Sequence, residues 1–159
     1  QRAGVFQPLL AVLPSPRLAD DGQVFALFPD LLYRSRDGGR AWQELPLPMQ
    51  AGPFASLAIA KARGDAVLYV GTEGNGLWSA RAPFEDWQRV KGLRADEVNF
   101  TLPGWVATTS GIYVADSKRW RKASDQPDVV CMAILDDGTL VAGTAGGGAW
   151  HAVTGASAD

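Results

Sequence analysis

Short apolar runs alternate with turn residues along the whole chain. Runs such as Leu57–Ala60 and Val98–Leu102 have the length of single strands, and no run approaches the roughly 18 apolar residues that span a bilayer. Turn pairs such as Asp21-Gly22 and Asp137-Gly138 separate the runs and are typical of hairpins. The pattern predicts an all-β protein of short antiparallel strands with no membrane span.

The same arrangement of runs recurs four times. In each copy two apolar strands and a turn precede an apolar–aromatic pair, and the aromatics at 33, 78, 113 and 150 lie 45, 35 and 37 residues apart. Up to four short strands in roughly 40 residues is the size of one β-propeller blade. The four pairs are Leu32-Tyr33, Leu77-Trp78, Ile112-Tyr113 and Ala149-Trp150.

We predict one β-propeller domain over residues 1–153, built from about four blades of four antiparallel strands, with a flexible tail at 154–159. An extra strand at residues 4–9 is expected to complete the last blade and close the ring, so that no sheet edge stays open. Because four blades is the lower limit for propellers, a partial propeller is the alternative. The expected blades are 10–48, 54–93, 97–124 and 128–153.

The segment Pro83–Leu93 is compatible with two structures. A proline in a first turn, followed by apolar residues three apart, is typical of a helix. However, Trp87-Gln88 matches Trp42-Gln43 of the preceding copy, where a strand is expected. Because copies of a repeat share their structure, a strand is favoured, and the helix is the alternative.

The hairpin after Tyr33 carries the most specific motif. Ser35-Arg36-Asp37-Gly38-Gly39-Arg40-Ala41-Trp42 matches the pattern Ser/Thr-x-Asp-x-Gly-x-x-Trp and resembles the Asp-box of BNR-repeat propellers. That family includes sialidases, sortilin-type receptors and the photosystem II assembly-factor group, and Gly71-Thr72 before a Gly-rich turn is similar to the last of these. The full motif occurs once, in Ser35, Asp37, Gly39 and Trp42.

The resemblance implies a structural task for this Asp-box. The carboxylate of Asp37 can accept backbone N–H groups and hold a tight turn, while Gly39 allows a backbone angle closed to other residues. Trp42 is expected to insert between strands and bury a large apolar area. We therefore expect the box to stabilise its hairpin rather than to bind a ligand or to catalyse.

Composition and charge exclude several classes of partner and metal site. Lys and Arg number 15 against 17 Asp and Glu, so the net charge of −2 provides no basic stripe for nucleic acid or anionic lipid. One Cys forbids an internal disulfide, and one Cys with one His cannot form the usual structural zinc site. We predict no cofactor, no metal and no nucleic-acid partner.

The resemblance also implies a second possible function, that of a sialidase-like glycosidase. Such an enzyme needs a Tyr nucleophile, an acid/base Asp and three Arg. All three tyrosines, Tyr33, Tyr69 and Tyr113, fall on repeated packing positions, so none is left over as a nucleophile. The arginines nearest the Asp-box are expected at its outer, solvated hairpin and are Arg34, Arg36 and Arg40.

A glycosidase with two carboxylates stays open on sequence alone. Its candidate carboxylates all lie beside Gly-containing turns, where turn chemistry is the simpler explanation, and are Asp65, Glu73, Asp136 and Asp137. His151 lies on an expected strand without a local motif. Cys131 lies in an apolar run and is expected to be a buried small hydrophobe rather than a nucleophile.

Two sequence features that the repeat does not explain are candidates for binding a partner. Trp105, beside Pro103-Gly104, either caps its blade or anchors a partner. A basic edge around Trp120 either protects an outer strand from aggregation or contacts an acidic patch of a partner, and comprises Lys118, Arg119, Arg121 and Lys122.

We therefore predict a non-catalytic binding or assembly module with a protein partner. The alternative is a carbohydrate-binding or glycoside-hydrolase propeller. The family resemblance favours an extracytoplasmic place, which would be periplasmic, lumenal or secreted.

Overall fold

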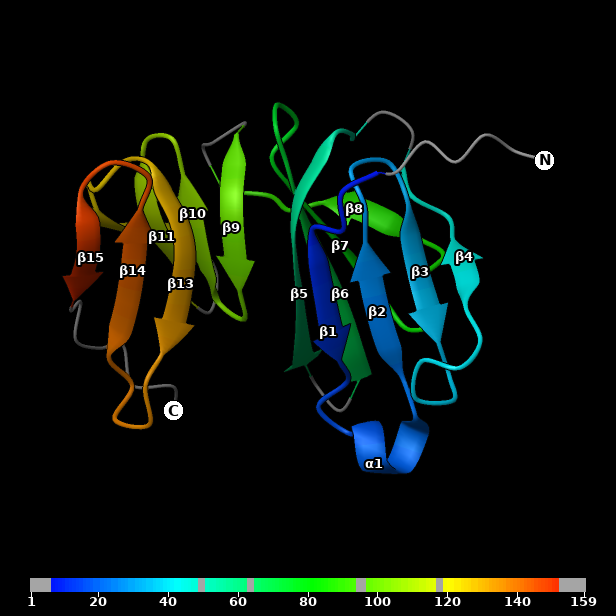
Figure 1. The fold of residues 1–159 in the computed structure, drawn as a ribbon. Helices are drawn as coiled ribbons and strands as arrows, with labels where there is room; N and C mark the ends of the chain where they lie inside the picture. The colour runs from blue at the N-terminus through cyan, green and yellow to red at the C-terminus, as the bar shows by residue number, and fades with distance from the viewer. Residues whose placement is uncertain (1–6, 49–50, 63–64, 94–96, 117–118, 152–159) are drawn as a thin grey trace.

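The fold is described by a computed structural model that covers residues 7–48, 51–62, 65–93, 97–116 and 119–151. Its strands form four antiparallel sheets, each made of consecutive strands, and a single helical turn among the described residues, α1 (Leu18–Asp21), links the first two strands of the first sheet (Figure 1). The sheets stand side by side as four blades. The predicted all-β propeller of about four blades is confirmed.

Each blade takes its strands in chain order. The first blade contains β1 (Ala11–Pro14), β2 (Val24–Leu27), β3 (Leu32–Ser35) and β4 (Gln43–Leu45), and the second contains β5 (Phe54–Ala62), β6 (Asp65–Thr72), β7 (Leu77–Arg81) and β8 (Trp87–Arg89). The third contains β9 (Val98–Leu102), β10 (Trp105–Thr108), β11 (Gly111–Asp116) and β12 (Arg119–Ser124), and the described part of the fourth contains β13 (Val129–Ile134), β14 (Leu140–Thr144) and β15 (Gly148–His151).

The first strands of the blades form the inner layer of an arc. β1 packs against β5, β5 against β9 and β9 against β13, whereas β13 is not packed against β1 in the same way. In Figure 1 β13 stands in the left half of the view and β1 near the middle, with β9 and β5 between them. The described residues therefore form an open arc rather than a closed ring.

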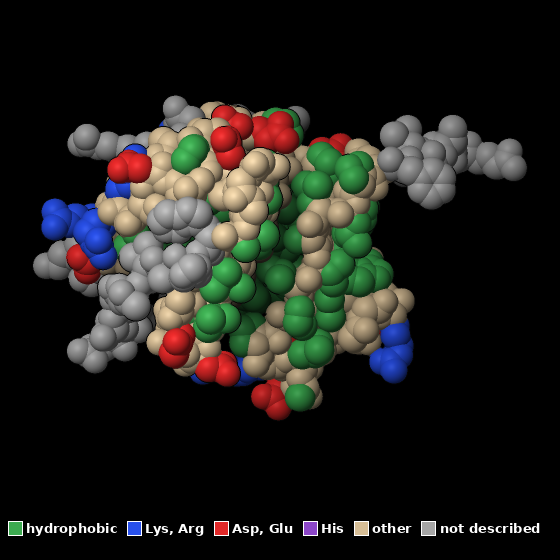
Figure 2. All heavy atoms as spheres, turned by 60° about the vertical axis from the view of Figure 1, so that its left-hand side comes forward, with side chains coloured by type: hydrophobic (Ala, Val, Ile, Leu, Met, Phe, Trp, Pro, Cys, Tyr) green, Lys and Arg blue, Asp and Glu red, His purple; other side chains and the backbone are tan. Residues whose placement is uncertain are grey.

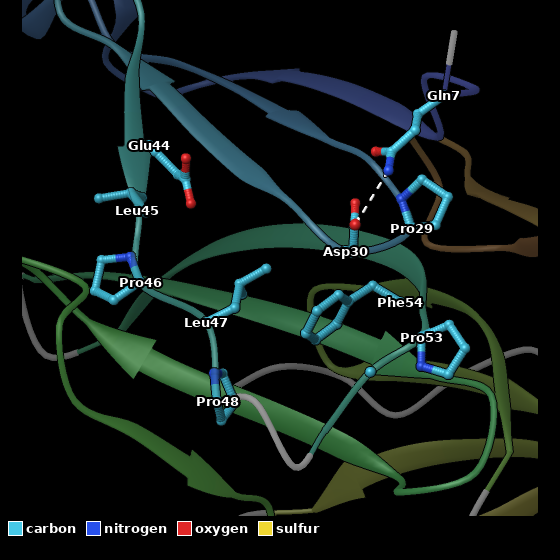
Figure 3. Close-up of a pocket in the computed structure, with 11 residues that line it drawn as sticks. Gln7, Pro29, Asp30, Glu44, Leu45, Pro46, Leu47, Pro48, Pro53 and Phe54 are labelled. Carbon is cyan, nitrogen blue, oxygen red and sulfur yellow. Dashed lines mark hydrogen bonds between the residues drawn. The ribbon is translucent and has the colours of Figure 1, made fainter. Parts of the chain in front are cut away.

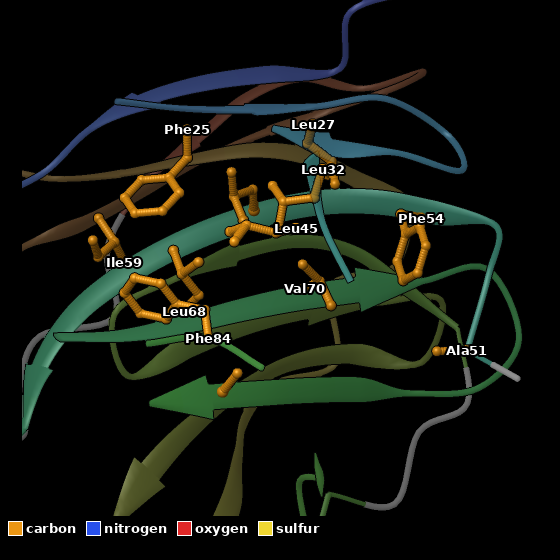
Figure 4. Close-up of a cluster of buried hydrophobic side chains, with 12 residues drawn as sticks. Phe25, Leu27, Leu32, Leu45, Ala51, Phe54, Ile59, Leu68, Val70 and Phe84 are labelled. Atoms are coloured by element: carbon orange, nitrogen blue, oxygen red, sulfur yellow. The ribbon is translucent and has the colours of Figure 1, made fainter. Parts of the chain in front are cut away.

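The core lies between the blades because successive side chains of a strand face opposite neighbours. Phe25 and Leu27 of β2 face the second blade, where Leu68 and Val70 of β6 meet them, and all four are fully buried (Figure 4). Burial of one such side chain contributes roughly 1.5–3 kcal/mol. Two further clusters join the second blade to the third and the third to the fourth.

The segment Pro83–Leu93 contains the strand β8 rather than the alternative helix. Trp87 pairs with Ala80 of β7, so the chain returns antiparallel along the blade. Phe84 precedes β8 with a φ of 73° and is 1% exposed, because its ring leaves the blade and enters the cluster between the first two blades.

The described part of the expected closing strand lies elsewhere. Residues 7–9 form no strand, and the Gln7 amide donates a hydrogen bond to Asp30, in the turn between β2 and β3. The described strands of the last sheet are β13, β14 and β15. Residues 4–6 lie outside the described residues, so closure by them stays a prediction.

Candidate functional site

A cavity lies where the first blade passes to the second (Figure 3). It has a volume of about 650 Å³. Three segments that are far apart in sequence line it: Gln7, the β2–β3 turn, and the link from β4 to β5. We call this cavity the proline pocket, and its lining residues are Gln7, Pro29, Asp30, Glu44, Leu45, Pro46, Leu47, Pro48, Gly52, Pro53 and Phe54.

The apolar lining of the proline pocket is held in place by the core. Leu45 and Phe54 are each 4% exposed and belong to the cluster that joins the first two blades, and Leu47 packs against that cluster. Trp87 of β8 fixes the link from the other side, because its indole Nε1 donates to the Pro46 carbonyl at 2.7 Å. Prolines with fixed φ values complete the wall and offer no N–H groups.

Polar groups of the proline pocket provide acceptors. Gln7 lines the pocket, and its Nε2 donates to Asp30 Oδ2 at 3.0 Å. Gln7 Oε1 is buried and has no hydrogen-bond partner among the described residues. The exposed carboxylate of Glu44 adds negative charge at the rim. A buried acceptor without a partner costs roughly 1–3 kcal/mol, so a donor that reached Gln7 Oε1 would be stabilised.

The proline pocket has no counterpart among the features predicted from the sequence. Its parts come from positions about 7, 30 and 45–54, which no periodic pattern connects. One local signal existed: of the 10 prolines in the chain, Pro46, Pro48 and Pro53 cluster in the link after the first blade. Such density is typical of a rigid extended connection that can line a binding groove.

The Asp37 hairpin is held by its own side chains. Asp37 Oδ1 accepts the N–H groups of Arg40 and Ala41, both at 2.9 Å, and the Ser35 hydroxyl donates to it at 2.7 Å. Ser35 Oγ in turn accepts the N–H of Gly39, whose φ is 93°. The N–H of Ala41 and the Ser35 hydroxyl lower the pKa of Asp37. These hydrogen bonds give the Asp37 carboxylate a structural role, which is to hold the turn of its hairpin.

Two expectations about this hairpin were wrong. Trp42 is 43% exposed rather than inserted between strands, because its indole Nε1 donates to the Gly39 carbonyl of the same turn. Arg34 is 7% exposed rather than solvated, because β3 directs it onto the Phe84 ring, and Nη1 donates to the Pro83 carbonyl. Desolvation and the charge of Arg36 lower the pKa of Arg34.

Trp105 occupies a repeated position of the blade. In β10 it precedes Val106 by one residue, as Tyr69 precedes Val70 in β6, and Val106 and Val70 pair with the aromatics Tyr113 and Trp78. Trp105 packs against the cluster between the third and fourth blades. This contact explains the aromatic residue, and partner binding at Trp105 stays a prediction.

The basic edge follows β12. Arg119, Arg121 and Lys122 are exposed, and Lys118 lies outside the described residues. Lys122 forms an ion pair with Asp125, which raises the pKa of its ammonium group. Arg119 pairs in register with Asp116 of β11. Partner binding at this edge also stays a prediction.

The candidate carboxylates lie in different blades, and Glu73 lies at the opposite end of its blade from Asp65. Asp65 begins β6 and Glu73 follows its end, so a strand of about 26 Å at roughly 3.3 Å per residue separates them. Asp136 and Asp137 lie in the turn between β13 and β14. Glu73 instead shares a cavity of about 350 Å³ with two acidic residues not predicted, Glu97 and Asp128.

The tyrosines lie in three different blades. Tyr33 stacks edge-to-face on Phe28, and Tyr113 hydrogen-bonds to Ser110. Tyr69 lines a polar cavity together with Arg81 and Asp86, and no further arginine is among the residues that line this cavity. Among the described residues, no cluster of His, Cys, Asp and Glu could hold a metal ion.

Cys131 is exposed on β13, so the expectation of a buried thiol was wrong. The register of β13 places it on the face away from the third blade, and no strand among the described residues covers that face. His151 ends β15, and its side chain lies outside what the structure describes. In the described part of the chain, no helix is long and apolar enough to cross a membrane.

No protein-family model matches the chain, and no curated protein is found similar to it. Solved structures are similar to it. YCF48 from Cyanidioschyzon merolae has a TM-score of 0.65 at 15% identity over 94% of this chain and 54% of its own. YCF48 bound to D1 peptide has a TM-score of 0.60 at 15% identity over 87% of this chain and 47% of its own.

The extracellular domain of the one-component system BT4673 from B. thetaiotaomicron has a TM-score of 0.61 at 18% identity, over 85% of this chain and 20% of its own. At such identities the likeness shows the propeller fold alone. This chain spans about half the length of the YCF48 chains that it matches.

Proposed function

We propose that this chain is a non-catalytic binding module that holds an extended segment of a partner protein in the proline pocket. The observation that carries the proposal is Gln7, which lines the pocket and whose buried Oε1 has no hydrogen-bond partner among the described residues. A backbone N–H of an extended peptide is the donor that would satisfy it.

The walls of the proline pocket define the rest of the partner segment. Pro29, Leu47 and Pro53 offer apolar surface without backbone N–H groups on the prolines, so an apolar side chain of the partner would bury area there. Glu44 and Asp30 lie beside this surface and favour a Lys or Arg in the partner segment. The preferred ligand is therefore an extended peptide with an apolar residue next to a basic one.

The comparison with solved structures supports a peptide as the ligand class. One of the similar propellers is YCF48 bound to D1 peptide, although its identity to this chain is 15%. A rigid, largely preformed pocket on a repeat scaffold suits such a ligand, because little conformational entropy is lost by the protein on binding.

A selection from a phage-displayed library of random peptides tests the proposal. Binders should be enriched in apolar–basic pairs, and their affinity should fall about tenfold in Gln7→Met and in Glu44→Lys. The first change removes the amide acceptor with little change of length, and the second reverses the charge at the rim.

Glu97→Lys is the matched control, since it makes the same charge change in the cavity with Glu73 and Asp128. Peptides that bind all three variants as tightly as the unchanged chain would place the site elsewhere. A library that yields no binder, together with binding to a glycan array, would contradict the protein-binding function itself.

A further inference from the structure

Basic side chains are distributed unevenly over the molecule. In Figure 2, hydrophobic side chains line a hollow in the face shown, and Lys and Arg side chains lie at the margins of that face. Two arginines, Arg34 and Arg36, instead line a cavity of about 290 Å³ between the first and second blades. We call this cavity the arginine pocket. It lies at the opposite end of β3 from the proline pocket, because Asp30 precedes the start of β3 and Arg36 follows its end.

The guanidinium of Arg34 is buried without a full set of partners. Its side chain is 7% exposed, and Nη1 donates to the Pro83 carbonyl at 3.3 Å. The Nε of Arg34 is buried and has no hydrogen-bond partner among the described residues. Because buried charges are stable when they are paired and hydrogen-bonded, an oxyanion that reached this Nε–H would be held by a charge-assisted hydrogen bond.

The charges around Arg34 leave the arginine pocket positive. Burial and the repulsion of Arg36 lower the pKa of Arg34, and Glu85, whose charge acts in the opposite direction, is not among the residues that line the pocket. Asp21 lines the pocket, but its carboxylate is engaged in its own turn, where Oδ1 accepts the backbone N–H of Gln23 at 2.9 Å and Oδ2 accepts its Nε2 at 3.2 Å. Two arginines against one aspartate leave one net positive charge on the lining.

Both walls of the arginine pocket are held in position by the backbone. On the first blade, the Gly38 N–H donates to the Gly22 carbonyl at 2.9 Å, and a Cβ on Gly22 would lie 2.6 Å from the Arg36 carbonyl oxygen. On the second blade, the Phe84 N–H donates to the Arg81 carbonyl at 2.7 Å. A preformed pocket loses little conformational entropy on binding, so a few well-placed contacts are sufficient for a small ligand.

The lining of the arginine pocket selects the class of ligand. The planar fork of a guanidinium matches two oxygens of a carboxylate or a phosphate. The single net positive charge favours an anion of one charge, because Asp21 would repel the second charge of a phosphate dianion. Ala82 and Pro83 are exposed and add apolar surface beside the arginines, which suits an apolar group attached to the anion. The volume lies near the lower limit of about 300 Å³ for ligand pockets, so the ligand is small.

We propose that the arginine pocket binds a small organic monocarboxylate. Its carboxylate accepts hydrogen bonds from Arg34 and Arg36, and its apolar part packs on Ala82 and Pro83. The ligand thus supplies the counter-charge that the lining does not provide. The site is independent of the peptide proposed for the proline pocket, because the two cavities share no lining residue.

The Nε–H resonance of Arg34 in the ¹⁵N-labelled chain tests the proposal. Titration with sodium benzoate at constant ionic strength should move this resonance downfield and saturate with a dissociation constant of about 1 mM. Sodium chloride at the same concentrations should leave it in place, which separates a hydrogen bond from a general effect of salt. Inorganic phosphate at about pH 8 should bind about tenfold more weakly than benzoate, because it carries the second charge.

Arginine variants locate the site. Arg36→Met should weaken benzoate binding about tenfold, and so should Arg34→Lys, which keeps the charge but removes the planar fork. Because Arg36 is exposed, Arg36→Met keeps the test valid even if Arg34→Lys does not fold. Arg40→Met is the matched control, since Arg40 is an exposed arginine of the same hairpin that does not line the pocket, and its variant should bind benzoate like the unchanged chain. Gln7→Met, in the proline pocket, should also leave benzoate binding unchanged.

Three results would overturn the proposal. The first is an Arg34 Nε–H resonance that does not move at about 50 mM benzoate. The second is an affinity for benzoate that Arg36→Met leaves unchanged or that Arg40→Met reduces equally, since either result would mean that no site is built around Arg36. The third is phosphate binding as tight as benzoate binding, which would contradict the carboxylate as the class of ligand.

Discussion

Phe84 offers the sharpest test of how the first two blades are held together. Its ring is 1% exposed, and it meets Phe25 edge-to-face with centroids 5.4 Å apart. Replacement of a buried Phe by Ala costs about 3–5 kcal/mol. Phe84 also borders a cavity of about 290 Å³ that water can enter, so we take about 3 kcal/mol for the lost burial.

Two ring contacts add to this cost. Loss of the edge-to-face pair with Phe25 contributes about 1 kcal/mol, while Arg34 lies 6.0 Å from the ring centroid, at the limit of a cation–π contact. The φ of 73° at this position is equally unfavourable for Phe and Ala and therefore cancels. Phe84→Ala should reduce the free energy of unfolding by about 4 kcal/mol.

Equilibrium urea unfolding, followed by tryptophan fluorescence, measures this change. The midpoint should fall while the m-value stays constant, and the melting temperature should fall by roughly 8–16 °C. Phe28→Ala is the matched control, since Phe28 is half-buried and stacks on Tyr33 at 5.9 Å. It should cost less than half as much. A loss below about 2 kcal/mol for Phe84→Ala, or equal losses in the two variants, would refute the role of Phe84 in joining the blades.

Other substitutions test close packing and the acidic turn. A Cβ on Gly71 would overlap Ser56 Oγ and a Val98 methyl, so Gly71→Ala should cost about 1–3 kcal/mol in thermal unfolding, whereas Gly74→Ala, with no heavy atom within 4 Å, should be neutral. The fold lowers the pKa of Asp37 below its ordinary 3.8, so its contribution to stability is complete above about pH 5 and is lost as pH falls through the folded pKa. The melting temperature of Asp37→Asn should therefore lie below that of the unchanged chain at about pH 6 and approach it near pH 2; a gap independent of pH would contradict the assignment.

The blades could be predicted from the sequence because their pattern of apolar and aromatic residues is local and repeated. Tyr33 and Trp78 mark equivalent strand positions, and the structure pairs them with Ala26 and Val70 as the repeat requires. Side-chain environments were less predictable, because they depend on which other segment covers a strand face. Cys131 is exposed although it lies in an apolar run, since no described strand covers its face of the fourth blade.

The same reason explains the errors near the Asp37 hairpin. Arg34 looked solvated from its neighbours in sequence, yet Phe84, 50 residues later, covers it. Trp42 looked buried by analogy with a family motif, yet its indole bonds to its own turn. The proline pocket depends on contacts between three separate segments, so a periodic pattern cannot identify it.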